Sequence, residues 1–497
     1  MKPFQILIFY ILILITLLGI AFIIPQDGVR IADGFTFQFP TVEELLNSDN
    51  PRSKKTDSLI QAQLAVLSDT INEQSFEPVL RNDTLASLLD IPVKQKIIHI
   101  DTLKVKVEKI SFSKASLSRL HQLFDRLQNP KSVIRILHYG DSQIEGDRIT
   151  SFLRNRLQKK FGGTGVGLIN PKPLVNTFAI DQTYTENWMR FPIFGAKDGE
   201  VNHKRYGILG AFCRYLPVVK DSTQTTNADS VYSGSLNLSE SKIAYATDRP
   251  MRNLTIFYAN GSEHVLNEIY TDGQMQFAKY LQTNTKFSKL KYRFNALPKS
   301  IDIKFSGKDS PDIYAISIDA DRGVVVDNIP MRGSSGTFFN QMDVNLLSQF
   351  YHSLDIGMIL LEFGGNVVPF IETEQGITNY EGWFESQIRT LRKIVPDVPI
   401  IVMGVADMSK KEKDKMITYP YVEPLRDAMK RAALNSGAAY WDMYEAMGGE
   451  NSMPEWVDAE PKLATDDYTH FTTKGAQIMG NMFYNALMYE YQKYTEK

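Results

Sequence analysis

The sequence predicts an α/β fold with a parallel sheet, an inserted antiparallel β-sandwich and an N-terminal transmembrane helix. Strand-like apolar runs alternate with amphipathic helical stripes on both sides of the chain's middle part, an order typical of parallel sheets. Short period-two runs separated by turn residues fill the middle, as in antiparallel sandwiches. Near the N-terminus, residues 4–24 form one uncharged apolar run.

The composition excludes several classes of protein. Of the 497 residues, 43% are hydrophobic and 23% are charged, which excludes a wholly disordered or polytopic membrane protein. The formal net charge of −2 is not the basic footprint of a nucleic-acid-binding protein. The single cysteine, Cys213, excludes an internal disulfide and cysteine-ligated metal sites. Because the histidines form no ligand motif either, we expect no catalytic metal and no other cofactor.

Residues 1–25 are the predicted membrane anchor. The run from Phe4 to Ile24 carries no charge, and a helix of that length spans about 31 Å, close to the hydrocarbon thickness of a bilayer. A cleaved signal peptide is the alternative, although the run ends Ala-Phe-Ile-Ile-Pro without a convincing cleavage site. Lys2 favours the inner side of the membrane. With no disulfides, we expect a single-pass anchor in a bacterial inner membrane with the remainder in the periplasm, or secretion after cleavage.

The segments that follow are assigned in order. Residues 26–115 are mixed and polar and are interpreted as a stalk, with a strand at 93–107. The α/β domain is expected over 116–215 and 321–497. Its strands are predicted at 133–139, 357–361 and 398–403, and its helices at 149–161, 383–394, 422–435 and 473–491.

Residues 216–320 are the predicted inserted β-sandwich. Its clearest strands, with alternating apolar and polar residues, are 253–258, 291–294, 300–305 and 313–318. Such a module can bind sugar or can only shape a cleft. Tyr270, Tyr280 and Tyr292 are candidates for stacking on a sugar ring, although core packing is the commoner use of any one of them.

The strand at 133–139 leads directly into Gly140-Asp141-Ser142-Gln143. Ser142 therefore stands at the carboxyl end of a parallel strand, where α/β folds place their active sites. The alternative is an ordinary strand–helix turn. The Gly-Asp-Ser triplet alone is a weak signal, because chance produces it in about one chain of this length in ten.

A second weak signal, Asp467-Tyr-Thr-His470, precedes the last predicted helix. An Asp three residues before a His can place its carboxylate on the ring Nδ1, which leaves Nε2 free as a base toward a serine. Asp466 is a rival carboxylate, disfavoured by its spacing of four residues. Ser335 is a rival nucleophile for which no motif places a base.

Ester cleavage also needs donors for the oxyanion that develops on the carbonyl oxygen. Gly333, in Met331-Arg-Gly-Ser-Ser-Gly336, can offer an unobstructed backbone N–H. Asn366, after Phe363-Gly-Gly, can offer its side-chain amide. A flexible loop and a left-handed turn are the respective alternatives.

The order of these candidate residues and their places at strand ends resemble the pattern of the SGNH (GDSL-type) hydrolase superfamily. The residues are Ser142, Gly333, Asn366 and Asp467/His470, and the resemblance covers 116–215 and 321–497. The closer resemblance is to its carbohydrate O-acetyl branch, the peptidoglycan O-acetylesterases and related O-acetyltransferases. That branch has a glycine-rich segment similar to Phe161-Gly-Gly-Thr-Gly-Val-Gly167 and an inserted β-sandwich. The chain departs from the family pattern in Gln143, after the serine, and in Arg332-Gly-Ser-Ser335, at the glycine block.

The resemblance implies a three-layer, flavodoxin-like domain and a serine esterase mechanism. Ser142 would attack an acetyl ester, His470 would take its proton and Asp467 would steady the imidazolium. The N–H groups of Ser142 and Gly333 and the amide of Asn366 would hold the oxyanion. The same residues serve hydrolysis and acetyl transfer to a sugar hydroxyl.

Three functions are therefore considered. The expected one is an esterase that removes O-acetyl groups from an acetylated envelope glycan such as peptidoglycan. The second is an O-acetyltransferase partnered with a membrane-bound O-acyltransferase, and the third is a non-catalytic glycan-binding protein. The lysine-rich run 409–415 is interpreted as a solvated loop, which as a cleft rim can attract an anionic glycan.

Overall fold

The structure is a computed structural model that describes residues 107–496 apart from 201–202, 216–230 and 284–285, and, before them, positions 9, 16, 19, 29–32, 35–37, 56 and 58–64. Residues 1–58 and 59–497 are two compact units. In the first, β1 (Val29–Ala32) and β2 (Phe35–Phe37) form an antiparallel hairpin. Nearly all of the predicted anchor and of the predicted strand at 93–107 lie outside the described residues. None of the described helices is long and apolar enough to cross a membrane.

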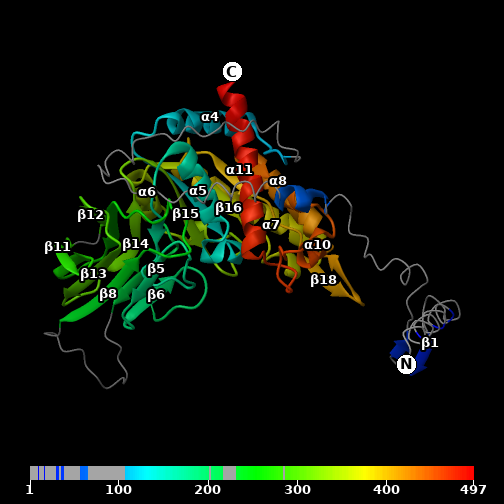
Figure 1. The fold of residues 1–497 in the computed structure, drawn as a ribbon, viewed down its shortest axis with the longest axis horizontal. Helices are drawn as coiled ribbons and strands as arrows, with labels where there is room; N and C mark the ends of the chain where they lie inside the picture. The colour runs from blue at the N-terminus through cyan, green and yellow to red at the C-terminus, as the bar shows by residue number, and fades with distance from the viewer. Residues whose placement is uncertain are drawn as a thin grey trace. The chain divides into compact units, whose positions relative to one another are not determined.

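A five-stranded parallel sheet forms the centre of the larger unit (Figure 1). Its strands, in spatial order, are β15 (Gly323–Pro330), β3 (Val133–Gly140), β16 (Ile356–Glu362), β17 (Ile400–Met403) and β20 (Ala439–Trp441), all paired in parallel. The three predicted strands of this sheet are confirmed as β3, β16 and β17. The two edge strands, β15 and β20, are additional to the prediction.

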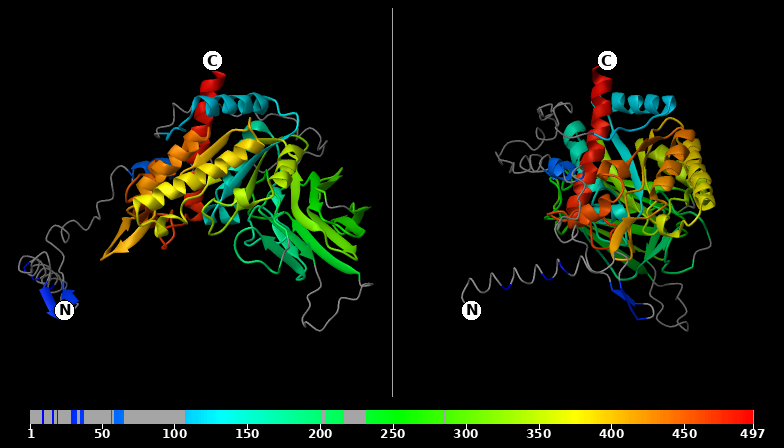
Figure 2. Two further views of the ribbon diagram at one scale, coloured as in Figure 1. Left: turned by 180° about the vertical axis from the view of Figure 1, so that it is seen from behind. Right: turned by 90° about the vertical axis from the view of Figure 1, so that its right-hand side faces the viewer.

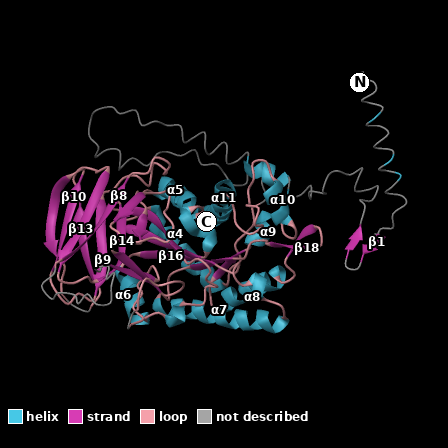
Figure 3. Cartoon of the chain, turned by 90° about the horizontal axis from the view of Figure 1, so that it is seen from below, coloured by secondary structure: helices cyan, strands magenta, loops and turns pink. Residues whose placement is uncertain are grey.

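Helices cover both faces of this sheet, which makes three layers (Figures 2 and 3). Alternation along β3 shows why, since Leu137 and Tyr139 join one hydrophobic core while Ile134 and Ile136 join the other. The first core packs against α6 (Val344–Ser353), α7 (Glu374–Ile394) and α8 (Val422–Asn435). The second packs against α4 (Lys114–Gln128), α5 (Thr150–Phe161), α9 (Met443–Met447), α10 (Ser452–Asp458) and α11 (Thr473–Thr495). The four predicted helices are confirmed as α5, α7, α8 and α11.

Side-chain caps fix where the long helices begin. Ser113 caps α4, Thr373 caps α7 and Thr472 caps α11, and each accepts a backbone N–H from the first turn. Such a cap contributes typically about 1 kcal/mol because it satisfies a donor without a partner inside the helix. The cap of α11 lies two residues after His470, so it fixes the end of the loop that carries this histidine.

Two antiparallel sheets lie beside the parallel sheet and share a hydrophobic core (Figure 3). One has the order β11 (Gln274–Tyr280), β10 (Val265–Thr271), β13 (Ser300–Gly307), β8 (Tyr232–Ser239) and β5 (Asp181–Tyr184). The other has the order β12 (Ser288–Arg293), β9 (Asn253–Ala259), β14 (Asp312–Asp319), β7 (Ala211–Tyr215) and β6 (Trp188–Pro192), with β4 (Gly167–Ile169) on β14. The four clearest predicted strands are present as β9, β12, β13 and β14.

The antiparallel sheets begin earlier in the chain than the predicted range 216–320. The strands β4 to β7 span only three to five residues each, too few for a period of two to stand out from the loops between them. Tyr292 is buried in the shared core, whereas Tyr280 is exposed on β11. Core packing is thus the use of Tyr292.

The carboxyl ends of three parallel strands lie level, and this alignment places the candidate site. Gly140 at the end of β3 pairs with Pro330 of β15 on one side and with Glu362 of β16 on the other. A Cβ at Gly140 would lie 3.0 Å from the carbonyl oxygen of Glu362, a tight contact that the glycine avoids. The segments carrying Ser142, Gly333 and Asn366 follow these three ends, as expected of a site in an open α/β sheet.

Candidate active site

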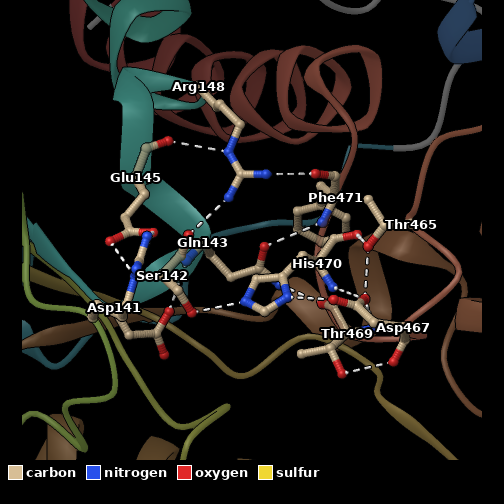
Figure 4. Close-up of polar contacts among 11 residues, drawn as sticks. Asp141, Ser142, Gln143, Glu145, Arg148, Thr465, Asp467, Thr469, His470 and Phe471 are labelled. Carbon is tan, nitrogen blue, oxygen red and sulfur yellow. Dashed lines mark hydrogen bonds and ion pairs between the residues drawn. The ribbon is translucent and has the colours of Figure 1, made fainter. Parts of the chain in front are cut away.

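Ser142 is the first residue of a short 3₁₀-helix, η3 (Ser142–Asp147), that follows β3. Asp141 caps this helix, because its Oδ1 accepts the backbone N–H of Gln143 at 3.0 Å. The cap holds the turn that directs the Ser142 hydroxyl toward the loop preceding α11 (Figure 4). The position of Ser142 at the strand end is thus fixed by the residue before it.

His470 comes from that loop, and Figure 4 shows its imidazole between the Ser142 hydroxyl and the Asp467 carboxylate. Its Nε2 lies 2.8 Å from Ser142 Oγ and its Nδ1 lies 2.7 Å from Asp467 Oδ2. The structure therefore brings together Ser142, His470 and Asp467, three residues that the sequence singles out at positions up to 328 residues apart. A hydrogen bond from Nδ1–H to the carboxylate selects the tautomer with a free Nε2, which can accept the serine proton.

The carboxylate of Asp467 is ionised over the working range of pH. Partial burial alone would raise its pKa, but hydrogen bonds from the hydroxyl of Thr465 and from the backbone and ring of His470 lower it to about 2. The rival Asp466 does not contact His470 and instead pairs with Lys462 at 2.6 Å. The spacing of three thus selects the partner of the histidine.

Two of the three predicted oxyanion donors, Gly333 and Asn366, differ in whether their N–H groups already have an acceptor. Gly333 has φ +78°, a backbone conformation that favours glycine, and its N–H has no acceptor among the described residues. Asn366 lines the same cleft as Ser142 and His470. Its amide donates to Asp141 Oδ2 at 3.1 Å and to the carbonyl of Ser334 at 3.2 Å. Both amide hydrogens are therefore engaged within the protein.

The cleft over these residues has a volume of about 190 Å³. Apolar side chains form much of its wall, among them Phe363, Met408 and Met443. Phe370 also lines it and is 83% exposed. The cleft thus has an apolar wall and an aromatic side chain available to a ligand.

The run 409–415 is not the predicted loop. It forms most of an antiparallel hairpin of β18 (Ser409–Glu412) and β19 (Lys415–Thr418). A two-residue turn with Lys413 at φ +53° closes the hairpin, and a charged sequence without Gly or Asn there gives no turn signal. Ser409 N–H donates to the carbonyl of Tyr468 at 3.1 Å, so the base of the hairpin contacts the loop of His470.

Several polar residues within or beside the motifs make contacts that the motifs do not predict. Asp141 is buried between the capped turn and Asn366, and burial together with the nearby carboxylate of Glu362 raises its pKa to about 7, despite hydrogen bonds from Gln143 and Asn366 that lower it. Arg332 of the glycine block forms a bidentate ion pair with Glu145 of η3. Glu145 and the block's unusual arginine are both visible in the sequence, but no spacing rule connects them.

The parallel sheet with helices on both faces and the antiparallel sheets beside it form a fold that also occurs in solved structures. Among solved structures, that of a peptidoglycan O-acetylesterase is similar, with a TM-score of 0.59 and 19% sequence identity, over 77% of this chain and 99% of that one. The likeness shows a shared fold. The resemblance predicted from the motifs is confirmed at this level.

Weaker likenesses are found to a protein from Parabacteroides merdae described as a GDSL-like lipase and to a family two carbohydrate esterase from Clostridium thermocellum. The first has a TM-score of 0.25 and 13% identity over 33% of this chain and 73% of that one. The second has a TM-score of 0.23 and 10% identity over 51% and 91%. No protein-family model matches the sequence, and no curated protein matches it.

Proposed function

We propose that this protein is a serine esterase that removes O-acetyl groups from a cell-envelope glycan such as peptidoglycan. One observation carries the proposal: Ser142, His470 and Asp467 are joined by hydrogen bonds of 2.8 and 2.7 Å at the edge of a cleft. This is the arrangement that activates a serine for acyl transfer. The shared fold with a peptidoglycan O-acetylesterase supports the choice of substrate class.

The reaction has two steps. In the first, Ser142 Oγ attacks the acetyl carbonyl carbon while His470 Nε2 takes its proton, and the sugar oxygen then leaves with that proton. In the second, water gives a proton to His470 and attacks the acetyl-serine, which releases acetate and restores Ser142. The N–H groups of Ser142 and Gly333, with Asn366, would stabilise the oxyanion of each tetrahedral intermediate.

Two further features support a glycan as the substrate. Phe370 exposes its ring at the cleft, and an aromatic face is suited to packing against the apolar face of a sugar ring. The lysine-bearing hairpin β18–β19 begins next to Met408, which lines the cleft. Lys410, Lys411 and Lys413 can attract a glycan with carboxylates.

We also propose, from the apolar N-terminal run, that the protein is attached to a bacterial inner membrane and acts on the periplasmic side. The partner would then be the acetylated glycan itself. The second candidate, transfer of acetyl groups from a membrane-bound O-acyltransferase, uses the same residues and is separated from hydrolysis by experiment.

The test is release of acetate by the full-length protein from 4-nitrophenyl acetate and from O-acetylated peptidoglycan, beside Ser142→Ala. We expect turnover of both substrates by the wild type and none above background by the variant. An added non-acetylated glycan acceptor distinguishes the two reactions, because a transferase would move acetyl groups to it. Binding of glycan by a folded protein without any ester turnover would overturn the esterase.

A further inference from the structure

The hydrogen bond between Ser142 and His470 joins two segments whose backbones do not pair with each other. Ser142 opens η3, whereas His470 belongs to the loop between Thr465 and the start of α11. Within that loop the N–H of Thr465 donates to the carbonyl of His470 at 2.8 Å, and Ala464 pairs with Phe471 in an isolated β-bridge. These contacts close the loop on itself but do not connect it to Ser142, so side chains between the two segments are needed to set the 2.8 Å contact between base and nucleophile.

Gln143 supplies this connection. Its side-chain Nε2 donates to the carbonyl of Thr469 at 2.6 Å, and its Oε1 accepts the N–H of Phe471 at 3.2 Å. These two backbone groups belong to the residues immediately before and after His470. The side-chain amide of Gln143 therefore binds the backbone on both sides of His470 (Figure 4).

Gln143 is in turn held in place next to Ser142. Gln143 follows Ser142 directly, and its own N–H is held by Asp141. Arg148 adds a second bridge from the same segment, since it donates to the carbonyls of both Ser142 and Phe471 at 2.8 Å (Figure 4). The distance between nucleophile and base is thus set through side chains of the segment that carries the nucleophile.

We propose that Gln143 is a positioning residue, which holds the His470 imidazole within hydrogen-bond distance of the Ser142 hydroxyl. The inference rests on the proposed esterase function for its effect on rate, and on the hydrogen bonds alone for its effect on the loop. An amide is suited to this role because it is a donor and an acceptor at once. Proton transfer requires a short contact, and a misplacement of about 1 Å can lower a rate about 100-fold.

Three variants test the role. Gln143→Met keeps the length of the side chain and removes both hydrogen bonds. Gln143→Glu keeps the acceptor for Phe471 but sets a carboxylate oxygen against the carbonyl of Thr469. Gln158→Met is the matched control, because Gln158 is a buried glutamine of α5 that donates to the backbone carbonyl of Gly165 at 3.0 Å.

With 4-nitrophenyl acetate and full-length protein, we expect Gln143→Met to lower kcat about 10- to 100-fold with KM changed less than about twofold. Gln158→Met should keep kcat within about twofold of the wild type. For Gln143→Glu, activity relative to the wild type should rise as the pH falls toward 5, because protonation of the carboxyl restores a donor for Thr469. The Met variant should show no such recovery.

Hydrogen exchange of the peptides covering residues 465–472 gives a readout independent of turnover. We expect Gln143→Met to accelerate exchange there, and Gln158→Met to leave it unchanged. Wild-type kcat in both Gln143 variants, or unchanged exchange of this loop, would overturn the proposal. If Gln143→Met does not fold, the pH dependence of Gln143→Glu decides. If the wild type has no activity that depends on Ser142, the proposed esterase function is overturned. The hydrogen-exchange data alone then decide whether Gln143 positions the loop.

Discussion

The acid–base half of the candidate site and its oxyanion half differ in how they are arranged. In the first, Ser142, His470 and Asp467 already make the two contacts that proton transfer needs. In the second, Gly333 has an N–H with no acceptor among the described residues, whereas the Asn366 amide already donates to Asp141 and to the carbonyl of Ser334. In the proposed reaction the first half needs no rearrangement, whereas Asn366 in the second would have to exchange a contact.

The carboxylates that support the two halves differ in the same way. Asp467, beside the histidine, has its pKa lowered to about 2 because hydrogen bonds outweigh the effect of burial. Asp141, beside Asn366, has its pKa raised to about 7, mainly by burial. The carboxylate of Asp467 thus keeps its charge, whereas the carboxyl of Asp141 gains or loses a proton near neutral pH.

The largest effect is expected in the acid–base half. His470→Ala removes the general base, so kcat for 4-nitrophenyl acetate should fall about 10²- to 10⁴-fold. Combining it with Ser142→Ala should add little, because the two residues act as a unit. Steady-state kinetics of the single and double variants provide the measurement. Two independent, multiplying losses would contradict a shared relay.

A smaller loss is expected in the oxyanion half. Asn366→Ala should lower kcat about 10²- to 10³-fold if the amide exchanges its 3.2 Å contact with Ser334 for the oxyanion during the reaction. Asn366→Asp is the matched variant, since it keeps the shape but places an acceptor where a donor is needed. Kinetics and melting temperature are measured together. A lowered melting temperature with unchanged kcat would show that Asn366 only joins Asp141 to Ser334.

The comparison between the halves also shows what the sequence can predict. Strands β3 and β16 are long apolar runs, and the motifs that follow them are therefore placed correctly. The edge strand β15 also has an apolar run, Gly323-Val-Val-Val326, but it continues Asp327-Asn328. Asp327 is buried because Arg135 of β3 pairs with it at 2.6 Å. The polar pair leaves only three valines before it, a run too short to be recognised as a strand from its own pattern.

Gln143 is a residue of the site whose contacts the sequence does not predict. In the sequence it is only a departure from the residue usual after the serine, and its partners lie 326 and 328 residues further along the chain. Local spacing predicts Asp467 and His470 because both belong to one turn. It cannot predict a side chain whose acceptor and donor come from a distant loop.

The raised pKa of Asp141 predicts an effect of pH on stability. The folded pKa of Asp141, about 7, lies above the usual value of about 3.9 in an unfolded chain. Between these values the folded state binds the extra proton, so the free energy of unfolding falls as pH rises, by at most about 1.4 kcal/mol per pH unit. In Asp141→Asn this loss is absent, so the stability of the variant relative to wild type should increase from about pH 4 to 7.

Denaturant unfolding between pH 4 and 8 provides the measurement. Asp321→Asn is the control, because hydrogen bonds from Arg293 and Asn253 lower the pKa of Asp321 to about 2, so its contribution to stability is lost only as pH falls toward 2. Relative to wild type, the stability of that variant should not change between pH 5 and 8. A flat difference for Asp141→Asn over the same range would mean that the carboxyl of Asp141 does not bind a proton near neutral pH.

The smallest effect concerns Phe370, which lines the cleft together with Ser142 and His470. Phe370→Ala should raise KM for O-acetylated peptidoglycan several-fold, because the lost ring face removes contact area with the sugar. Turnover of 4-nitrophenyl acetate should not change, since its acetyl group reaches Ser142 without that contact. The matched control is Trp383→Ala, an exposed aromatic on α7 that does not line the cleft. Equal effects of Phe370→Ala on both substrates would mean that the ring takes part in the reaction rather than in glycan binding. The comparison between the acid–base half and the oxyanion half would then have to include Phe370.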